Sequence, residues 1–171
     1  MSDEQTGGDA NVAAAERRVA IVSGGGTGIG AAITRALRDA GWDVVIFGRR
    51  PHALSVVAEE TGAVAITADV TDPAAADELL RTAVDRFGRL DALVLNAAVS
   101  RPGRFADLSD EDWRLMTETN LIGAARLTRA CLPDLSKAEG VVVGVASLAV
   151  LRASSFMSGY APSKARLGLM L

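Results

Sequence analysis

The sequence predicts an α/β fold in which a doubly wound parallel sheet carries helices on both faces. Three observations indicate this class. Short apolar segments alternate five times with segments that have the spacing of amphipathic helices. The apolar segments are hydrophobic at successive positions, which is typical of strands buried on both faces of a parallel sheet. A cluster of glycines follows the first of these segments, at the point where such sheets bind ligands.

The first half of the chain is expected to form three strands and two helices. Ile33, Ala36 and Leu37 share one helical face, and Gly41 ends that helix. Pro51 suits the first turn of the next helix because its missing N–H is not needed there. We expect strands at 19–23, 43–48 and 63–67, and helices at 30–40 and 51–61.

The second half continues the alternation. Asp72 is expected to cap a helix with Pro73 at its first position, and Gly88 to end it. Ser109 is expected to cap a long helix whose acidic first turn favours the helix dipole. We expect helices at 72–87, 110–132 and from 158 onward, strands at 90–95 and 140–146, and loops at 97–108 and 147–157. Right-handed crossovers between such strands give a Rossmann-like topology.

The 171 residues suit one domain, which we expect to span 17–171 after a flexible acidic tail at 1–16. The tail holds four of the 21 acidic residues and none of the 18 basic ones. The rest of the chain is therefore nearly neutral. This balance argues against a nucleic-acid partner, which requires a basic surface.

Other classes of protein are disfavoured by what the sequence lacks. No uncharged apolar run approaches the ~20 residues of a membrane helix, so no membrane partner is expected. The N-terminus has neither the basic start nor the apolar stretch of a signal peptide. Cys131 is the sole cysteine and cannot form an internal disulfide, which favours a cytoplasmic location. No cluster of Cys, His or carboxylate residues indicates a metal site.

The glycine cluster predicts a phosphate-binding loop. Glycine adopts backbone angles closed to other residues and lets a ligand approach closely. The following helix offers free N–H groups and its positive dipole end to a pyrophosphate. No Gly-Lys-Ser/Thr follows, so the loop is not a P-loop, and the alternative is a flexible turn without a ligand. The candidate cofactor-binding residues are Gly24, Gly26, Thr27, Gly28, Ile29 and Gly30.

The end of the second strand indicates which dinucleotide the loop would hold. An NAD site usually has an acidic residue there, which binds the ribose 2′-hydroxyl. This chain has Arg49 and Arg50 instead. A guanidinium pairs with a 2′-phosphate in a forked geometry, so the sequence favours NADP(H) over NAD(H). The alternative is an ordinary solvated arginine pair in a loop.

A tyrosine and a lysine form a candidate acid/base pair. Tyr160, the only tyrosine, stands four residues before Lys164, one of two lysines. On a helix these side chains share a face. An ammonium group near a phenol favours the phenolate form, which suits a general acid/base. The alternative is a partly buried tyrosine beside a surface lysine.

Two further polar residues are candidates for the same site. Ser147 lies at the carboxyl end of the fifth strand, where its hydroxyl could bind a substrate oxygen. Asn120 is a polar residue in an apolar stretch, and buried amides need partners. It therefore either bridges to the site or bonds to backbone as a structural residue.

Together these residues resemble the short-chain dehydrogenase/reductase family. Gly24, Gly28 and Gly30 match its Thr-Gly-x-x-x-Gly-x-Gly pattern, with Ser23 in place of the usual threonine. Asp69-Val70 resembles the pair that contacts adenine, and Asn96-Ala97-Ala98 resembles the family's Asn-Ala-Gly motif with alanine for the glycine. The positions that match the family's catalytic tetrad are Asn120, Ser147, Tyr160 and Lys164.

The resemblance implies reversible hydride transfer between a nicotinamide and a small-molecule carbonyl or secondary alcohol. Tyr160 would then protonate the carbonyl oxygen, and Ser147 would hold that oxygen. Lys164 would bond the nicotinamide ribose and support the tyrosine. Asn120 would anchor a water linked to Lys164. The resemblance also implies a homo-oligomer, a dimer or a tetramer, and the long helix is apolar on more than one face.

The chain is shorter than the resembling family, and we expect it to lack the last strands of the family fold. The fifth strand would then be an exposed apolar edge. An alternative function is therefore a non-catalytic, truncated nucleotide-binding or interaction protein that retains the tetrad as a relic. Residues 148–157 are mostly apolar, which indicates a hydrophobic substrate if the chain is an enzyme.

Overall fold

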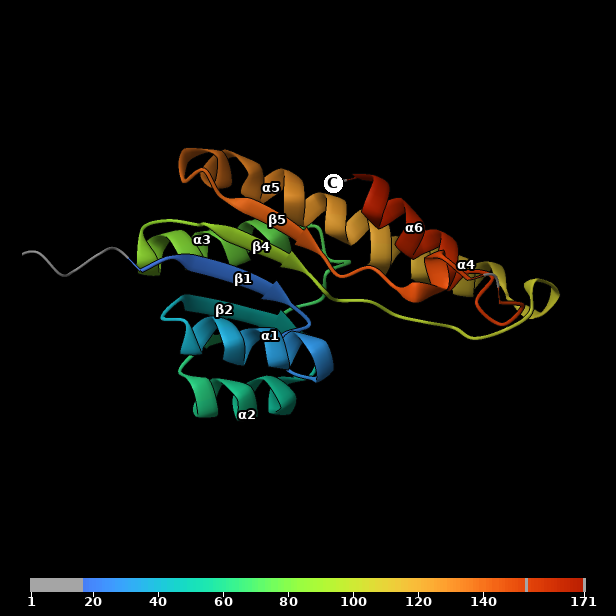
Figure 1. Cartoon of the computed structure of the whole chain (residues 1–171), viewed down its shortest axis with the longest axis horizontal. Coiled ribbons are helices and arrows are strands. Elements are labelled where there is room, and N and C mark those ends of the chain that lie inside the picture. Colours follow the sequence, from blue (N-terminus) through green and yellow to red (C-terminus); the bar gives the residue numbers. More distant parts are fainter. Residues whose placement is uncertain (1–16, 153, 171) are drawn as a thin grey trace, which may run out of the picture.

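The computed structural model describes residues 17–152 and 154–170, in which five parallel strands form one sheet (Figure 1). The expected tail at 1–16 lies outside the described residues. The strand order is β3-β2-β1-β4-β5. The strands are β1 Val19–Ser23, β2 Asp43–Gly48, β3 Val64–Thr67, β4 Ala92–Leu95 and β5 Val141–Gly144. The order reverses between β1 and β4, so the doubly wound parallel sheet is confirmed.

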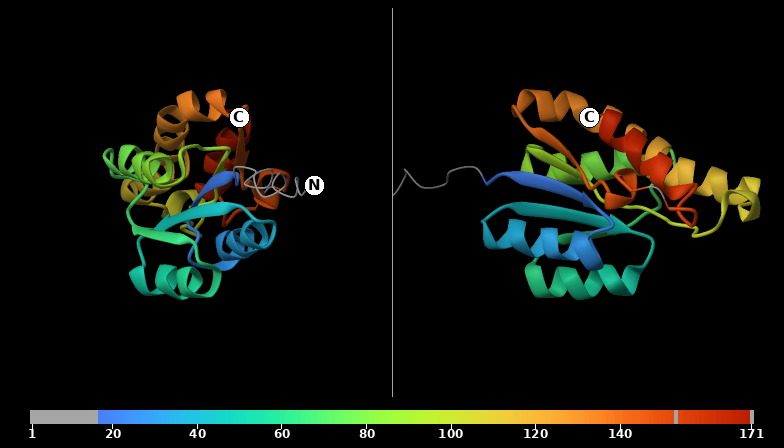
Figure 2. Two further views of the ribbon diagram at one scale, coloured as in Figure 1. Left: turned by 90° about the vertical axis from the view of Figure 1, so that its left-hand side faces the viewer. Right: turned by 45° about the vertical axis from the view of Figure 1, so that its right-hand side comes forward.

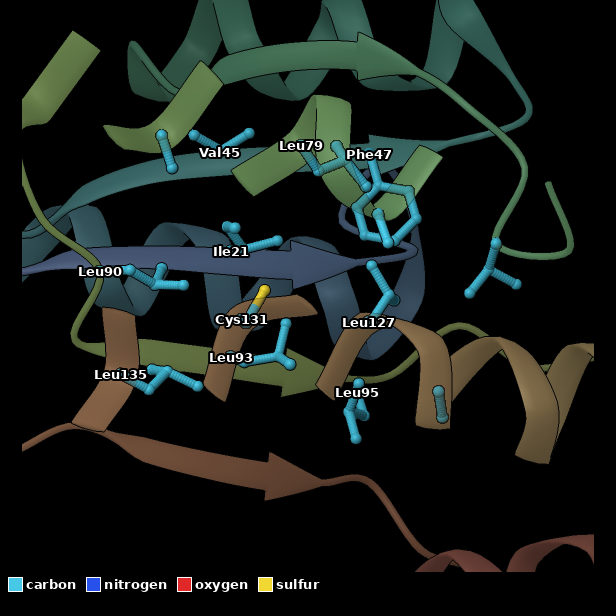
Figure 3. Packing of buried hydrophobic residues seen from close by; sticks show 14 of the residues in the cluster. Ile21, Val45, Phe47, Leu79, Leu90, Leu93, Leu95, Leu127, Cys131 and Leu135 are labelled. Carbon is cyan, nitrogen blue, oxygen red and sulfur yellow. The ribbon is translucent and has the colours of Figure 1, made fainter. Parts of the chain in front are cut away.

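Helices cover both faces of this sheet, because its central strands are apolar on both sides (Figure 2). On one face α1 (Gly28–Asp39) and α2 (Pro51–Thr61) pack on β1, β2 and β4 through Ala31, Leu54 and Val57. On the other face α3 (Ala75–Phe87) and α5 (Gly123–Lys137) contribute Leu79 and Leu127 to a second cluster (Figure 3).

The helix expected at 110–132 is longer and is not uniform. It consists of α4 (Asp110–Thr117), a π-helical segment η2 (Glu118–Ile122) and α5, which continues past Pro133 to Lys137. The Ser109 cap is confirmed, since its hydroxyl accepts the Asp112 N–H in a capping box. The expected end was wrong because Pro133 is exposed, where water can satisfy the carbonyl that its missing N–H leaves unpaired.

Other boundaries differ by a few residues. Regular helix α3 begins at Ala75 rather than at Pro73, although the Asp72 carboxylate does accept the Ala74 N–H. The strands expected at 90–95 and 140–146 are shorter, and α1 begins two residues earlier than expected, at Gly28. None of the helices in the described ranges is long and apolar enough to cross a membrane.

The β5 strand is an open edge of the sheet. Val141 and Val143 are 54% and 47% exposed, because no strand follows β5 in the sheet order. The apolar edge expected for a short chain is therefore present.

The C-terminal helix lies at the carboxyl end of the strands. Short 3₁₀ segments η1 (Phe105–Asp107) and η3 (Leu148–Val150) lie in the loops that follow β4 and β5. Helix α6 (Tyr160–Met170) packs against η2 and η3, and it runs beside α5 (Figure 1). Gly159, just before α6, lies against α4, where a Cβ atom would meet the end of the Met116 side chain at 2.2 Å.

Candidate functional site

A pocket of about 350 Å³ opens at the carboxyl ends of β1 to β4. Ten of the predicted cofactor-binding residues line it: Gly24, Gly26, Thr27, Ile29, Arg49, Arg50, Asp69, Val70, Asn96 and Ala97. Ala98 of the Asn96-Ala97-Ala98 motif also lines it, and residues that the sequence analysis did not select complete the wall: Phe47, Gly48, Ala53, Leu54, Ala68 and Thr119. Gly28 and Gly30 are not part of this lining, and neither are the tetrad residues.

The glycine loop needs glycine for two separate reasons. Gly24 and Gly28 have φ values of 66° and 54°, in the left-handed region that side chains disfavour. Gly30 permits a close approach instead, because a Cβ atom there would lie 2.2 Å from the Gly24 carbonyl oxygen. The loop can therefore turn sharply and still pack its helix against β1.

The N-terminus of α1 presents unpaired N–H groups at this loop. Thr27 occupies the N-cap position, but its side chain caps no backbone N–H, and the first turn has no acidic residue. The Thr27 hydroxyl instead accepts a hydrogen bond of 2.7 Å from Nη2 of Arg50. An uncapped helix start beside an arginine suits an anionic diphosphate.

The two arginines occupy different positions at the pocket. Arg50 is held against the glycine loop by Thr27. Arg49 is 62% exposed, and its Nη1 lies 3.9 Å from a carboxylate oxygen of Asp69. Arg49 is thus the freer of the two guanidinium groups, and a 2′-phosphate could compete for it with Asp69.

Ser23 joins the glycine loop to the end of β4. Its buried hydroxyl donates to the Val94 carbonyl and accepts from the N–H groups of Asn96 and Ala97, at 2.8 and 2.9 Å. The Asn96 amide in turn donates to the carbonyls of Ser23 and Gly24. Asn96 therefore positions the loop while it lines the pocket. In the sequence, the role of Ser23 is indicated by its place as the polar last residue of an otherwise apolar strand.

The predicted acid/base pair starts the last helix. Tyr160 is the first residue of α6 and is half-buried. Lys164 follows one turn later, is 2% exposed, and donates through Nζ to the Val145 carbonyl at 2.7 Å. Burial lowers the pKa of the Lys164 ammonium group from its usual value.

Ser147 follows β5, as expected, and is half-buried. Its hydroxyl accepts the Ala149 N–H at 3.2 Å and caps η3. The same hydroxyl can still donate its own proton to a substrate oxygen.

Asn120 lies in the π-helical segment and ties the loop after β4 to α6. Its Oδ1 accepts the Val99 N–H at 2.8 Å, and its Nδ2 donates to the Val99 carbonyl and to Ser163 Oγ, both at 2.9 Å. Ser163 then donates to the Tyr160 carbonyl at 2.7 Å. Asn120 therefore bonds to the backbone of Val99 and also bridges, through Ser163, to the helix that carries Tyr160. The contacts also identify Ser163 as part of this network. In the sequence, Ser163 is indicated by its position three residues after Tyr160 on the same helix.

Lys164 and the pocket are connected through the neighbouring ends of β4 and β5. The Val145 N–H donates to the Leu95 carbonyl, and the next residue, Asn96, lines the pocket. The site of Tyr160 and Lys164 thus adjoins the glycine-lined pocket at one edge of the sheet. Among the described residues, no three His, Cys, Asp or Glu side chains gather as metal ligands.

The fold and the pocket define a doubly wound α/β protein with a glycine-lined site at the switch point of its sheet. Comparison with known proteins gives the family. The family model for short chain dehydrogenase matches residues 18–170. This chain belongs to the short-chain dehydrogenase family of oxidoreductases.

Individual relatives agree with this assignment. The chain is 32% identical over 156 residues to an uncharacterised oxidoreductase of Staphylococcus epidermidis, covering 90% of this chain and 64% of that protein. A short-chain dehydrogenase structure from Streptomyces avermitilis matches with a TM-score of 0.85 and 33% identity, over 92% of this chain and 59% of the other.

A third match includes a bound nucleotide. An alcohol dehydrogenase from Thermococcus sibiricus, complexed with 5-hydroxy-NADP, matches with a TM-score of 0.81 and 28% identity. The match covers 91% of this chain and 68% of the other. The chain thus spans about three fifths of the length of these proteins.

Proposed function

We propose that this chain carries the cofactor pocket and acid/base pair of an NADP(H)-dependent oxidoreductase, which acts on a small-molecule carbonyl or secondary alcohol. The observation that carries the proposal is the junction at Val145. The carbonyl of Val145 holds Lys164, and its N–H is bonded to the strand that leads into the glycine-lined pocket. A dinucleotide reaching from the glycine loop toward this junction would approach the acid/base pair.

The residues of the pocket fit a dinucleotide diphosphate and a 2′-phosphate. The uncapped start of α1 would donate N–H groups to the diphosphate, beside Gly26 and Thr27. Arg49 would bind the 2′-phosphate, while Arg50 would order Thr27 and add positive charge. Asp69 and Val70 would contact adenine. The nicotinamide, when bound, would supply or accept the hydride.

The acid/base work falls to residues of α6 and η3. In reduction, the Tyr160 hydroxyl would donate its proton to the carbonyl oxygen as the carbonyl carbon gains a hydride, and oxidation would reverse both transfers. Ser147 would hold the same oxygen by a hydrogen bond. Lys164 would stabilise the phenolate through its nearby positive charge and bond the nicotinamide ribose. Asn120 would keep α6 in register through Ser163.

A second candidate function is a nucleotide-binding or interaction protein without turnover. It is favoured by the exposed apolar β5 edge, which a partner could cover. Catalysis needs an α6 held within about 1 Å, since such a displacement can cost about a hundredfold in rate. Turnover by this chain separates the two functions.

We also propose a cytoplasmic homo-oligomer. The free thiol of Cys131 is buried, and burial raises its pKa to about 12, so it stays protonated and inert. A dimer or tetramer would cover exposed apolar residues of α5 such as Leu132. Light scattering that shows a clean monomer would refute the oligomer.

Titration with NADPH and NADH tests the proposal directly. We expect micromolar NADPH binding, with weaker binding of NADH. Arg49→Ala is expected to reduce this preference by more than tenfold, because it removes a charge-assisted bond to the 2′-phosphate. Equal binding of both nucleotides would exclude NADP(H) specificity. In a turnover assay, Tyr160→Phe should abolish activity while leaving NADPH binding intact.

A further inference from the structure

Thr119 has a buried hydroxyl that the rest of the fold does not satisfy. The residue is 6% exposed, and its Oγ1 is the one buried side-chain oxygen or nitrogen in the described part of the chain that has no hydrogen-bond partner. Thr119 also lines the pocket. Unpaired buried hydroxyls are costly, so native proteins tend to keep them where a ligand or water completes them.

Other helical threonines of this chain avoid this cost. The hydroxyls of Thr34, Thr61, Thr82 and Thr128 each donate to the carbonyl four residues earlier, at 2.6–2.9 Å. Thr119 makes no such bond, and it lies in the π-helical segment η2. In a π turn each backbone N–H pairs with the carbonyl five residues back instead of four. The carbonyl that accepts a threonine hydroxyl in an α-helix is therefore displaced.

The position of η2 shows which end of the pocket Thr119 faces. Gly123 follows Thr119 by one turn on the same face, and a Cβ atom at Gly123 would lie 2.7 Å from both the carbonyl oxygen and a methyl group of Val70. This face therefore rests on the segment after β3, where Asp69 and Val70 line the pocket. The neighbouring Asn120 turns instead toward Val99 and Ser163.

We propose that the Thr119 hydroxyl hydrogen-bonds the adenosine portion of the nucleotide that the pocket holds. The inference rests on the proposed nucleotide-binding function. Adenosine offers ring nitrogens and ribose hydroxyls, and a threonine hydroxyl can bond to either. The oxygen is shielded in the free protein, and threonine has two χ1 rotamers available in a helix. The proposal requires a χ1 rotation that turns the hydroxyl toward the pocket when a ligand is bound.

The test compares Thr119→Val, which replaces the hydroxyl with a methyl group, with Thr119→Ser, which retains the hydroxyl and loses the methyl group. Binding of NADPH and of 2′,5′-ADP is measured by calorimetry, and the melting temperature of each free protein is measured separately. We expect Thr119→Val to weaken both ligands about three- to tenfold, as for one lost hydrogen bond. The same variant should raise the melting temperature by about 2–4 °C, because it removes an unpaired hydroxyl. Thr119→Ser should bind both ligands within about twofold of the parent chain.

Three results would overturn the inference while leaving the proposed function intact. They are unchanged affinity in Thr119→Val, a lowered melting temperature of that variant in the free state, and a loss seen with NADPH but not with 2′,5′-ADP. If the parent chain binds neither ligand, the proposed function fails, and this inference fails with it. The melting temperatures would then still report whether the hydroxyl lacks a partner.

Discussion

Lys164, a candidate catalytic residue, is expected to lower the stability of the free protein. The residue is 2% exposed, and among the described residues its ammonium group has one acceptor, the Val145 carbonyl. The described residues include no carboxylate in ion-pair contact with it. Replacing a buried charge by an apolar group of similar shape is often stabilising. Lys164→Met should therefore raise the free energy of unfolding by about 1–3 kcal/mol at neutral pH.

The pH dependence of this gain follows from the direction of the pKa shift. Burial lowers the pKa of Lys164 in the folded state, so the unfolded chain binds the proton more tightly. The free-energy cost of burying the charged ammonium group is largest where Lys164 is protonated in both the folded and the unfolded protein. It declines as pH rises through the lowered pKa toward the ordinary value near 10.5. The advantage of Lys164→Met should therefore be largest at neutral pH and shrink in alkali.

The assay is urea unfolding of both proteins between pH 7 and pH 10, followed by tryptophan fluorescence. Lys137→Met is the matched control, because Lys137 is the other lysine and its side chain is 75% exposed. That control should change the free energy of unfolding by less than about 0.5 kcal/mol. Lys164→Met should also still bind 2′,5′-ADP, since Lys164 does not line the pocket. If Lys164→Met is less stable than the parent at every pH, the bond to Val145 outweighs desolvation and the reasoning is wrong.

Three further predictions concern the sheet and its loop. Asp91 is buried, and although burial raises its pKa, hydrogen bonds from Arg89 and from a β1 N–H outweigh this and lower it. Asp91→Asn should therefore lower the free energy of unfolding by about 2–4 kcal/mol at pH 7, as measured by urea unfolding. The stability of the parent chain should fall as the pH drops below 3.8, the ordinary pKa of an aspartate. Gly30→Ala should weaken NADPH binding at least about tenfold, since its Cβ would collide with a loop carbonyl, whereas Gly168→Ala in open space should bind normally in the same titration. Val143→Lys should suppress concentration-dependent association in light scattering, because it places a charge on the open β5 edge; unchanged association would mean that another surface is responsible.

The strand and helix positions were largely predictable because each depends on local sequence. Strand β2 and helix α2 have the expected bounds, since continuous apolar residues and Pro51 act within their own segments. The interior of the long helix was not predictable. The π turn at Glu118–Ile122 packs against α6, and the following Gly123 packs against Val70, both of which are distant in sequence.

The features of the candidate site also divide into those that local sequence predicts and those that depend on distant segments. The glycine loop, the arginine pair and the Tyr160–Lys164 spacing are local patterns whose chemistry can be inferred from residue type and interval. The partners of Lys164 and Asn120 are not local, since Val145 and Val99 come from other segments. Sequence spacing therefore identified which side chains could act, but not which backbone groups hold them.

The sequence by itself determined the parallel α/β class, the glycine-rich turn after β1 and the acid/base candidates. Each of these depends on periodicity, conformational freedom or charge within a few residues. Only the tertiary structure decided that Arg50 donates a hydrogen bond to Thr27. It also decided that, among the residues that the structure describes, buried Lys164 has no carboxylate partner and the Thr119 hydroxyl beside the pocket has no hydrogen-bond partner. Burial and hydrogen-bond satisfaction are set by which segments meet in space, and that meeting is a property of the whole fold.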